Sequence, residues 1–246
     1  MEEKVALVTG GIRGIGEKIS LRFLKEGYQV VAFDNDAGRL NDWAETQKAA
    51  GFEKIDTVVC DVSDYEQCQA AVASVLNKYE HIDVLVNNAG ITRDATFKKM
   101  DKSQWDAVIQ VNLNSMFNMT KPVIENMLTN QRGRIINMSS INGQKGQFGQ
   151  ANYSAAKAGV HGFTKALAQE VARKNITVNT ISPGYINTEM MQAIPDDVLE
   201  NIKAQIPVGR LGEADEIAEL VLYLCGDKSG YITGSNIAIN GGQHMC

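Results

Sequence analysis

Three residues whose types suit proton transfer stand near the middle of the chain: Ser140, Tyr153 and Lys157. Tyr153 and Lys157 are four residues apart in a segment with a helical pattern, so they share one face, one turn apart. A phenol with a pKa of about 10 is a weak acid–base group at neutral pH, but a nearby ammonium favours the phenolate and lowers that pKa. Ser140 ends an apolar run, where its hydroxyl could hold a substrate carbonyl oxygen. The spacing therefore predicts an acid–base site in which Lys157 lowers the pKa of Tyr153.

A glycine-rich turn follows the first apolar run of the chain. In TGGIRGIG, Gly10, Gly14 and Gly16 stand where a strand gives way to a helix that begins near Ile15. Glycine lets the backbone approach a pyrophosphate, and the start of the helix presents free amides and a positive dipole end to the phosphate charge. Tight turns also use glycine for packing alone. Here the strand before, the helix after and an acid at the end of the next strand together indicate a dinucleotide site.

That acid is Asp34, and it bears on the choice of nicotinamide cofactor. A carboxylate at this position accepts hydrogen bonds from the adenosine ribose. It also repels a 2′-phosphate, at a cost of roughly 4 kcal/mol for two charges about 4 Å apart. Arg13, inside the glycine turn, could instead pair with a 2′-phosphate, so NADPH stays open. We expect NAD(P)H as the cofactor, with NADH favoured by Asp34.

Two further strand ends face the same ligand. After the third apolar run, Asp61 could hydrogen-bond the adenine amine while Val62 packs on the ring, and residues 87–90 (NNAG) put small side chains and an amide beside the cofactor. Structural roles are also open, because Asp61 could cap the helix near Asp64 and Asn87 could brace neighbouring strands. The predicted cofactor residues so far are Gly10, Ile12, Arg13, Gly14, Ile15, Gly16, Asp34, Asp61, Val62, Asn88, Ala89 and Gly90.

Apolar β-branched runs alternate with helical patterns along the whole chain, as strands covered on both faces and joined by helices should. The runs lie at residues 5–10, 28–33, 55–62, 82–90, 133–140, 176–184 and 236–242. The helical patterns lie at residues 15–26, 39–50, 64–79, 102–127, 153–173 and 213–225. This alternation predicts an α/β fold, a single Rossmann-type doubly wound parallel sheet of about seven strands with helices on both faces.

One longer irregular segment, residues 186–210, interrupts the alternation between the sixth run and the next helix. Ligands bind beyond the carboxyl ends of such strands, so this insert is well placed as a substrate lid. A plain surface helix and turn is the other interpretation. Since no linker divides the chain, we expect one dinucleotide-binding and catalytic domain over residues 1–246.

Composition excludes several classes of function. A net charge of −5 argues against nucleic-acid binding, which needs a basic surface. No apolar stretch approaches the roughly 20 residues that span a bilayer, and the acidic start lacks the pattern of a signal peptide. The cysteines, at positions 60, 68, 225 and 246, form no Cys-x-x-Cys pair and do not cluster with the three histidines. We expect reduced thiols, no metal site and no membrane partner, in a cytoplasmic protein.

Taken together, the motifs TGGIRGIG, NNAG, VNLNSMF, YSAAK and SPGYINTEM resemble those of the short-chain dehydrogenase/reductase family, from end to end of the chain. The resemblance implies that Tyr153 donates a proton to a carbonyl and that Lys157 lowers its pKa and binds the nicotinamide ribose. It also implies that Ser140 orients the substrate and that Asn112 holds a water between Lys157 and solvent. Hydride would come from the nicotinamide. The further cofactor residues implied are Tyr153, Lys157, Pro183, Gly184 and Ile186.

Within that family, residues 142–172 and the tail NGGQHM look most like the acetoacetyl-coenzyme A reductases of polyhydroxyalkanoate synthesis. The 3-oxoacyl-carrier-protein reductases of fatty-acid synthesis are the alternative. Both reduce a 3-oxoacyl thioester, and the resemblance implies an (R)-3-hydroxy product. Phe148 and Tyr185 would form apolar walls for the acyl chain, and glutamines would bind the thioester. The substrate residues implied are Asp94, Lys99, Ser140, Gln147, Phe148, Gln150 and Tyr185.

Each residue of the acid–base set has an ordinary structural role when it is taken alone. Ser140 could cap a turn, Tyr153 could be a half-buried aromatic, Lys157 a solvated charge and Asn112 a polar group inside a helix. A non-catalytic dinucleotide-binding regulator would need the glycine turn but not this whole set, so its presence favours an enzyme. Family members usually pair their long helices across a two-fold axis, and we therefore expect a homotetramer.

Overall fold

The strands of this chain run parallel, so their carboxyl ends lie at one edge of the sheet. In residues 3–192 and 195–245, which the computed structural model describes, seven parallel strands form one sheet in the order β3-β2-β1-β4-β5-β6-β9. The chain adds β2 and β3 on one side of β1 and then crosses to add β4 on the other side, and this point between β1 and β4 is the switch point at which open α/β sheets bind ligands. The strands are β1 (Val5–Thr9), β2 (Gln29–Asp34), β3 (Ile55–Val59), β4 (Val84–Asn87), β5 (Gly133–Met138), β6 (Ile176–Pro183) and β9 (Asn236–Ile239).

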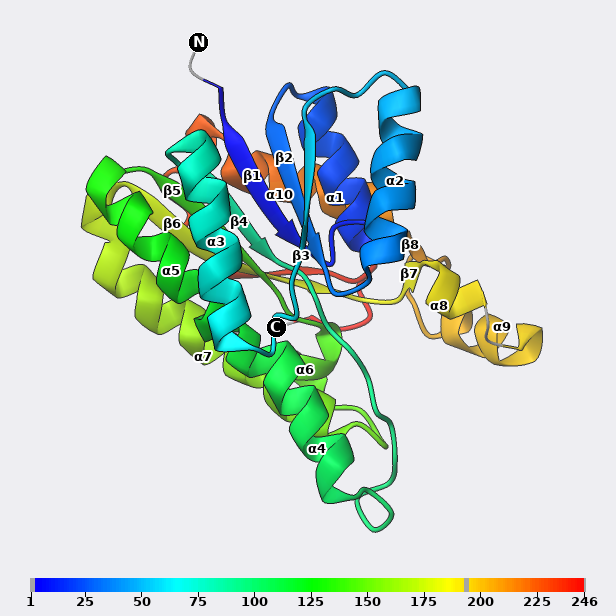
Figure 1. Cartoon of the computed structure of the whole chain (residues 1–246). Helices are drawn as coiled ribbons and strands as arrows, with labels where there is room; N and C mark the ends of the chain where they lie inside the picture. Colours follow the sequence, from blue (N-terminus) through cyan, green and yellow to red (C-terminus); the bar gives the residue numbers. More distant parts are fainter. Residues whose placement is uncertain (1–2, 193–194, 246) are drawn as a thin grey trace.

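Helices cover both faces of this sheet, so the predicted fold class is confirmed (Figure 1). One face carries α1 (Gly14–Lys25), α2 (Ala37–Ala49) and α10 (Ala214–Cys225). The other carries α3 (Tyr65–Tyr79), α5 (Ser115–Asn130) and α7 (Ala151–Val171). Successive strand residues divide between the two sides: Ala6 and Val8 enter the core under α1 and α10, whereas Val5 and Leu7 enter the core under α3 and α5. Two apolar cores therefore hold the sheet rigid from both sides.

The long helical pattern at residues 102–127 does not form one uniform helix. It divides into α4 (Lys102–Ile109), a π-helical turn at Gln110–Asn114 and α5, which ends at Asn130. Asn112 lies in that turn, and its Nδ2 donates to the Val108 carbonyl oxygen at 3.0 Å. This side-chain donor competes with the backbone for a helical carbonyl, which is a recognised cause of local widening. The prediction of a single helix is therefore corrected at its centre.

The remaining elements lie outside the predicted alternation of strands and helices, although a surface helix and turn was one interpretation of residues 186–210. A short helix α6 (Ile141–Lys145) stands between β5 and α7. The insert at residues 186–210 contains α8 (Glu189–Gln192) and α9 (Asp196–Ala204), and its strand β7 (Ile186–Asn187) pairs in parallel with β8 (Gly212–Glu213). Met191, Ile206 and Leu211 form a small separate core under this insert. The insert therefore extends beyond the carboxyl edge of the sheet, beside β6 (Figure 1).

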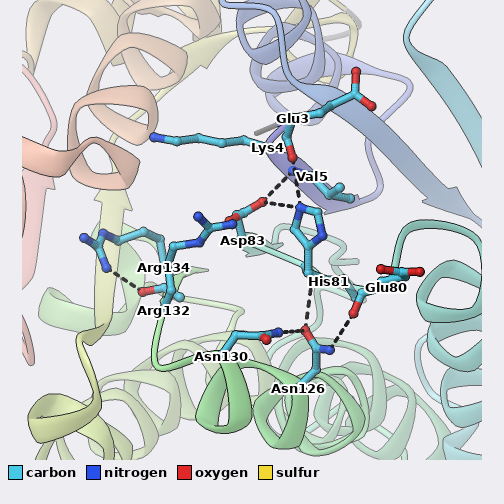
Figure 2. Close-up of polar contacts among 12 residues, drawn as sticks. Glu3, Lys4, Val5, Glu80, His81, Asp83, Asn126, Asn130, Arg132 and Arg134 are labelled. Atoms are coloured by element: carbon cyan, nitrogen blue, oxygen red, sulfur yellow. Dashed lines mark hydrogen bonds and ion pairs between the residues drawn. The ribbon is translucent and has the colours of Figure 1, made fainter. Parts of the chain in front are cut away.

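An ionic cluster fixes the opposite, amino edge of the sheet (Figure 2). Asp83, just before β4, is 4% exposed, and its Oδ2 accepts a hydrogen bond from the backbone amide of Val5 at 2.7 Å. The same carboxylate forms an ion pair with Arg132, and its Oδ2 lies 3.4 Å from Nε2 of the His81 ring. The His81 ring also contacts the Glu3 carbonyl oxygen at 2.9 Å. One buried carboxylate thus ties the start of β1 to the start of β4.

No helix in the described part of the chain is long and apolar enough to cross a membrane.

Candidate active site

The turn after β1 leaves backbone, rather than side chains, at the carboxyl edge of the sheet. Gly10 has a φ of +60°, and its amide donates to the Phe33 carbonyl oxygen at 2.7 Å. A Cβ on Gly16 would lie 2.0 Å from the Gly10 carbonyl oxygen, so no other residue fits there without moving the turn. Helix α1 begins at Gly14 with unpaired amides directed outward. Ile12 is buried in the core, and Ile15 packs at its margin.

Asn88 and Ala89 brace this turn from the neighbouring strand. The Asn88 side chain donates to the carbonyl oxygens of Thr9 and Gly10 at 3.0 and 3.2 Å. The backbone amides of Asn88 and Ala89 both donate to the Thr9 hydroxyl at 3.0 Å. Asn87 braces β5, because its Nδ2 donates to Asn137 Oδ1 at 2.9 Å. The structural role considered for Asn87 is therefore present, and Asn88 has one as well.

Asp34 and Arg13, the two residues that compete for the cofactor's ribose, differ in how they are held. Asp34 is 6% exposed at the end of β2, and its Oδ1 accepts the backbone amide of Asp36 at 3.2 Å. Its second carboxylate oxygen makes no hydrogen bond to any described residue. Arg13 is exposed at the N-cap of α1, and its side chain pairs with none of the described residues. The buried acid is thus fixed in place, whereas the arginine is not.

Asp61 does not cap the next helix. Its Oδ1 accepts hydrogen bonds from the Ser63 amide at 2.9 Å and the Ser63 hydroxyl at 2.7 Å, while Asp64 caps α3 through the Gln67 amide. The capping role considered for Asp61 is therefore wrong, because a closer N-cap residue takes it. Val62 is buried at 7% exposure.

The acid–base set is brought together beyond β5. Ser140 caps α6, with its hydroxyl oxygen accepting the Asn142 amide at 3.1 Å, and the Ser140 side chain also hydrogen-bonds Tyr153. Lys157 is 3% exposed, and its Nζ lies 5.7 Å from the centre of the Tyr153 ring. Nζ donates to the Met138 carbonyl oxygen at 2.8 Å. Strand β5 and the first two turns of α7 therefore position all three residues, as their spacing predicted.

The expected lowering of the Tyr153 pKa is wrong for this structure. Burial raises the pKa of Tyr153; the hydrogen bond with Ser140 opposes that rise, and the negative charge of Asp94 adds to it. Burial also lowers the pKa of Lys157 to about 8, because desolvation disfavours its charged form. Lys157 Nζ donates its hydrogen bond to Met138 rather than to the phenol, and burial disfavours its charged form. Its effect on the pKa of Tyr153 is therefore smaller than the effect of desolvation. The protein holds the phenol firmly protonated at neutral pH.

Asn112 reaches this centre from the π-helical turn. It is fully buried, and its Oδ1 accepts the Ile91 amide at 3.1 Å while its Nδ2 donates to the Ile91 carbonyl oxygen at 2.8 Å. Gly90 separates Asn112 from Lys157: a Cβ there would lie 2.5 Å from Asn112 Oδ1 and 3.6 Å from Lys157 Nζ. A side chain at position 90 would collide with the Asn112 amide oxygen, so glycine lets Asn112 approach the backbone beside Lys157.

Six of the predicted substrate residues fall into three sets: a hydrogen-bonded pair, an exposed group and Tyr185. Asp94 and Gln150 meet, since Gln150 Nε2 donates to Asp94 Oδ2 at 2.8 Å. Phe148 is 87% exposed, and Gln147 and Lys99 are exposed as well. Tyr185 is half-buried against the small core under the insert, and so is set apart from the exposed group.

Sequence reasoning missed the residues that hold this loop. Asn142 Nδ2 donates to Gln150 Oε1 at 2.9 Å, and Asn152 Nδ2 donates to the carbonyl oxygens of Arg93 and Gln104. The Ser139 hydroxyl donates to the Lys157 carbonyl oxygen at 2.8 Å. Their signal was a concentration of short polar side chains on both sides of the acid–base residues, in a segment that otherwise reads as a loop.

The comparisons with known proteins agree with this geometry. A family model described as enoyl-(acyl carrier protein) reductase matches residues 10–244. The acetoacetyl-CoA reductase of Cupriavidus necator is 52% identical over 246 residues, covering 100% of both chains. The acetoacetyl-CoA reductase of Shinella zoogloeoides is 57% identical over 245 residues, and the 3-oxoacyl-[acyl-carrier-protein] reductase of Thermotoga maritima is 44% identical over 243 residues, each covering 98% of both chains. The chain belongs to the short-chain dehydrogenase/reductase family.

Membership of this family implies a nicotinamide dinucleotide, and the described residues fit one. The backbone-lined turn at Gly10 and Gly16 leaves room for a pyrophosphate, and Asp34 has a carboxylate oxygen to spare for a hydroxyl. Pro183 ends β6 at the same edge. Two other predicted cofactor residues also have packing roles, because a Cβ on Gly184 would lie 2.8 Å from the Asn240 Cα and Ile186 is buried in the core.

Proposed function

We propose that this protein reduces acetoacetyl-CoA, or a close 3-oxoacyl-CoA, to the (R)-3-hydroxyacyl-CoA with NAD(P)H. The observation that carries the proposal is the assembly of Ser140, Tyr153 and a buried Lys157 at the edge of the sheet that also holds the glycine turn. The names of relatives at 52% and 57% identity, which cover the whole chain, support the choice of acetoacetyl-CoA.

In this proposal the protein supplies position and a proton. The bound nicotinamide supplies the hydride. The Ser140 hydroxyl holds the substrate's carbonyl oxygen near the Tyr153 phenol, with which it already forms a hydrogen bond. Tyr153 then gives its proton to that oxygen as negative charge develops there. Because its pKa is raised, Tyr153 stays protonated at neutral pH and can donate a proton in the direction of reduction.

Lys157 and Asn112 complete the site in two ways. The ammonium of Lys157, one turn from Tyr153, stabilises the phenolate that proton transfer leaves behind and binds the nicotinamide ribose. We assign to Asn112 Oδ1 a water that restores the proton through Lys157, supported by the close approach of both side chains to Gly90. The pKa of Lys157, about 8, lets that group pass a proton near neutral pH.

We propose NADH as the preferred cofactor, because a buried, fixed Asp34 would face any 2′-phosphate while Arg13 has no contact to hold it there. The remaining assigned cofactor residues line the same edge: Asp61 and Val62 for the adenine, and Pro183, Gly184 and Ile186 for the nicotinamide. Replacing Asp34 by Asn should raise kcat/KM for NADPH relative to NADH. Replacing Arg13 by Gln tests the competing assignment, because a clear loss of kcat/KM with NADPH alone would show that Arg13 pairs with the 2′-phosphate.

For the substrate we assign the exposed group of Lys99, Gln147 and Phe148 to the pantetheine arm, and the pair Asp94 and Gln150, with Tyr185, to the acyl end. Residues 186–210 would act as the lid of this single domain, supported by their own small core, which is separate from the two main cores. The acyl-carrier-protein thioester is the alternative substrate, favoured by the Thermotoga maritima relative.

We also propose a homotetramer in the cytoplasm. The outward face of α7 carries small residues at Ala151, Ala155 and Ala158, and Phe117 of α5 is 55% exposed, a combination suited to helix pairing between copies. The thiols of Cys60, Cys68 and Cys225 are free, as suits a reducing compartment. Light scattering should give about four times the 26.8 kDa chain mass, and a monomer mass would contradict the assembly.

The deciding experiment is the loss of reduced-nicotinamide absorbance with acetoacetyl-CoA, run with NADH and with NADPH on the purified protein. Turnover that yields the (R)-alcohol supports the proposal. Turnover only with the acyl-carrier-protein thioester would transfer it to the alternative substrate. Nucleotide binding with no turnover on either thioester would contradict the proposed reaction.

A further inference from the structure

Two buried cysteines meet directly beneath the segment that we assign to the cofactor's adenine. Cys60 follows β3 and Cys68 lies in the first turn of α3, and their exposed fractions are 1% and 0%. Their Sγ atoms lie 3.8 Å apart and share an S–H···S hydrogen bond. Spacing alone did not reveal this pair, because eight residues and a turn separate the two positions.

The pair is coupled to the loop between them. The Cys68 thiol lies 3.6 Å from the Val62 carbonyl oxygen and 3.8 Å from that of Asp61, with both carbonyls as acceptors. The Cys60 amide donates to the Asp34 carbonyl oxygen at 2.9 Å. The Cys68 thiol is therefore bonded to the backbone of Asp61 and Val62, and the Cys60 amide is bonded to the backbone of Asp34, the three residues proposed to contact the adenosine.

We propose that Cys60 and Cys68 form a redox-sensitive dithiol, which a peroxide oxidises to an intramolecular disulfide that weakens dinucleotide binding. The effect on binding rests on the proposed cofactor site, whereas the formation of the disulfide does not.

The chemistry balances with hydrogen peroxide as the oxidant. The Cys60 sulfur attacks one peroxide oxygen, the O–O bond breaks, and a sulfenic acid and one water form. The Cys68 sulfur then attacks the Cys60 sulfur, the S–S bond forms, and the hydroxyl leaves as the second water. The two thiols lose two electrons and two protons in total. The side-chain interaction with Cys68, whose sulfur lies 3.8 Å away, lowers the pKa of Cys60, which favours Cys60 as the first nucleophile.

Disulfide formation must displace the loop. A disulfide has an S–S length of about 2.05 Å, so the sulfurs must approach by more than an ångström and a half from 3.8 Å. Both cysteines and Val62 belong to the same apolar core, but Cys68 is held there on helix α3. Cys60 lies outside any helix or strand, and Asp61 and Ser63 beside it are half-exposed, so this loop can shift more readily than α3. Its carbonyls also lose the S–H donor of Cys68.

The same loop controls the access of peroxide to the Cys60 sulfur. Val59, next to Cys60, is 57% exposed, so a small opening of the loop admits peroxide to the sulfur. A nucleotide lying on Asp61 and Val62 would cover that path and slow the oxidation. Binding and oxidation are linked. If the disulfide lowers the affinity for the nucleotide, then a bound nucleotide disfavours formation of the disulfide to the same degree.

The test uses the full chain carrying Cys246→Ser, so that oxidation between chains through the last residue does not interfere. After peroxide treatment, peptide mapping should show one link joining Cys60 to Cys68 and the loss of two hydrogens. NADH affinity, measured by fluorescence titration, should fall by about 5-fold to 150-fold and return with dithiothreitol. The Cys60→Ser variant cannot form the link, so after peroxide treatment it should bind NADH as tightly as the reduced parent does. If circular dichroism shows that this variant misfolds, Cys68→Ala takes its place with the same expected result.

Cys225→Ser is the control, because Cys225 is buried and the one sulfur–sulfur hydrogen bond of the described residues joins Cys60 to Cys68, and it should oxidise and respond like the parent. The absence of a Cys60–Cys68 link would overturn the dithiol. A link formed without change in NADH affinity would overturn the coupling to binding. If the reduced protein bound neither NADH nor NADPH, the proposed function would fail separately, with the mapped link still deciding the dithiol.

Discussion

At the scale of single residues, burial rather than charge pairing sets the protonation of the site. Tyr153 and Lys157 are close, yet desolvation raises the pKa of the first and lowers the pKa of the second. The sequence could predict that these residues share a helix face, since that follows from their spacing. It could not predict the sign of the Tyr153 shift, because desolvation depends on everything packed around the phenol.

Tyr153→Phe tests the proton donor with a change of one atom. The variant should lose a factor of about 10² to 10⁴ in kcat, because only the hydroxyl that hydrogen-bonds Ser140 is removed. Steady-state kinetics with acetoacetyl-CoA and nucleotide titration check this result. The dissociation constant for NADH should change little. Turnover at the parent rate would contradict the role of the phenol.

Lys157→Met tests the energetic cost of the buried ammonium. The pKa of Lys157 is about 8 in the folded protein against 10.5 for an ordinary lysine, so below pH 8 folding desolvates a charge. Methionine should therefore stabilise the protein at pH 7 by about 1–3 kcal/mol, less the lost hydrogen bond to Met138, while abolishing turnover.

The sign of this effect depends on pH. Between pH 8 and 10.5 the unfolded chain binds more protons at Lys157 than the folded one, so the parent gains stability as pH rises. Urea unfolding at pH 7 and pH 10 should thus show the advantage of the methionine variant shrinking. An advantage that grows with pH would refute the explanation.

At the scale of elements, short irregular segments place the reactive groups, and regular elements support them. The seven strands follow from apolar runs, which sequence reveals well, whereas their order is known from the structure. The π-helical turn that carries Asn112 and the short helix α6 capped by Ser140 were not predicted. Both arise from side chains that bond the backbone, Asn112 to Val108 and Ser140 to Asn142, and such bonds depend on geometry that periodicity does not encode.

Gly16→Ala tests the turn between β1 and α1. A Cβ at Gly16 would lie 2.0 Å from the Gly10 carbonyl oxygen, a backbone atom that can move only with the whole turn. We expect nucleotide binding to fall by more than about tenfold, or 1.4 kcal/mol, as judged by fluorescence titration. Gly38→Ala in α2, whose Cβ would make only an ordinary 3.5 Å contact, is the matched control and should bind normally.

At the scale of the whole molecule, the two edges of the sheet have different roles: the carboxyl edge forms the candidate site, and the amino edge contributes to stability. The carboxyl edge keeps backbone and buried polar groups open to ligands, and the amino edge closes on Asp83. Stability can therefore be changed at one edge with little effect on the chemistry at the other.

Asp83→Asn tests that separation. Loss of the buried charge leaves Arg132 and His81 without their carboxylate partner, and we expect the free energy of unfolding to fall by about 1–3 kcal/mol. Glu125→Gln, which breaks the exposed pair with Lys121, should change it by less than about 0.5 kcal/mol. Urea unfolding at one fixed protein concentration compares them. An equal kcat for both variants is expected, and a reduced kcat for Asp83→Asn alone would contradict the division between the edges.

The order of the strands also affects how the chain folds while it is being synthesised. Strand β1 lies between β2 and β4, and its contact with Asp83 spans 78 residues. At about 5–20 residues per second, a ribosome leaves one edge of β1 unpaired for roughly 4–16 s after β1 emerges. During that interval β1 to β3 exist without the strand that covers them, and an open strand edge readily pairs with a foreign chain. The nascent chain is thus most exposed to aggregation, and to chaperones, before residue 84 leaves the ribosome.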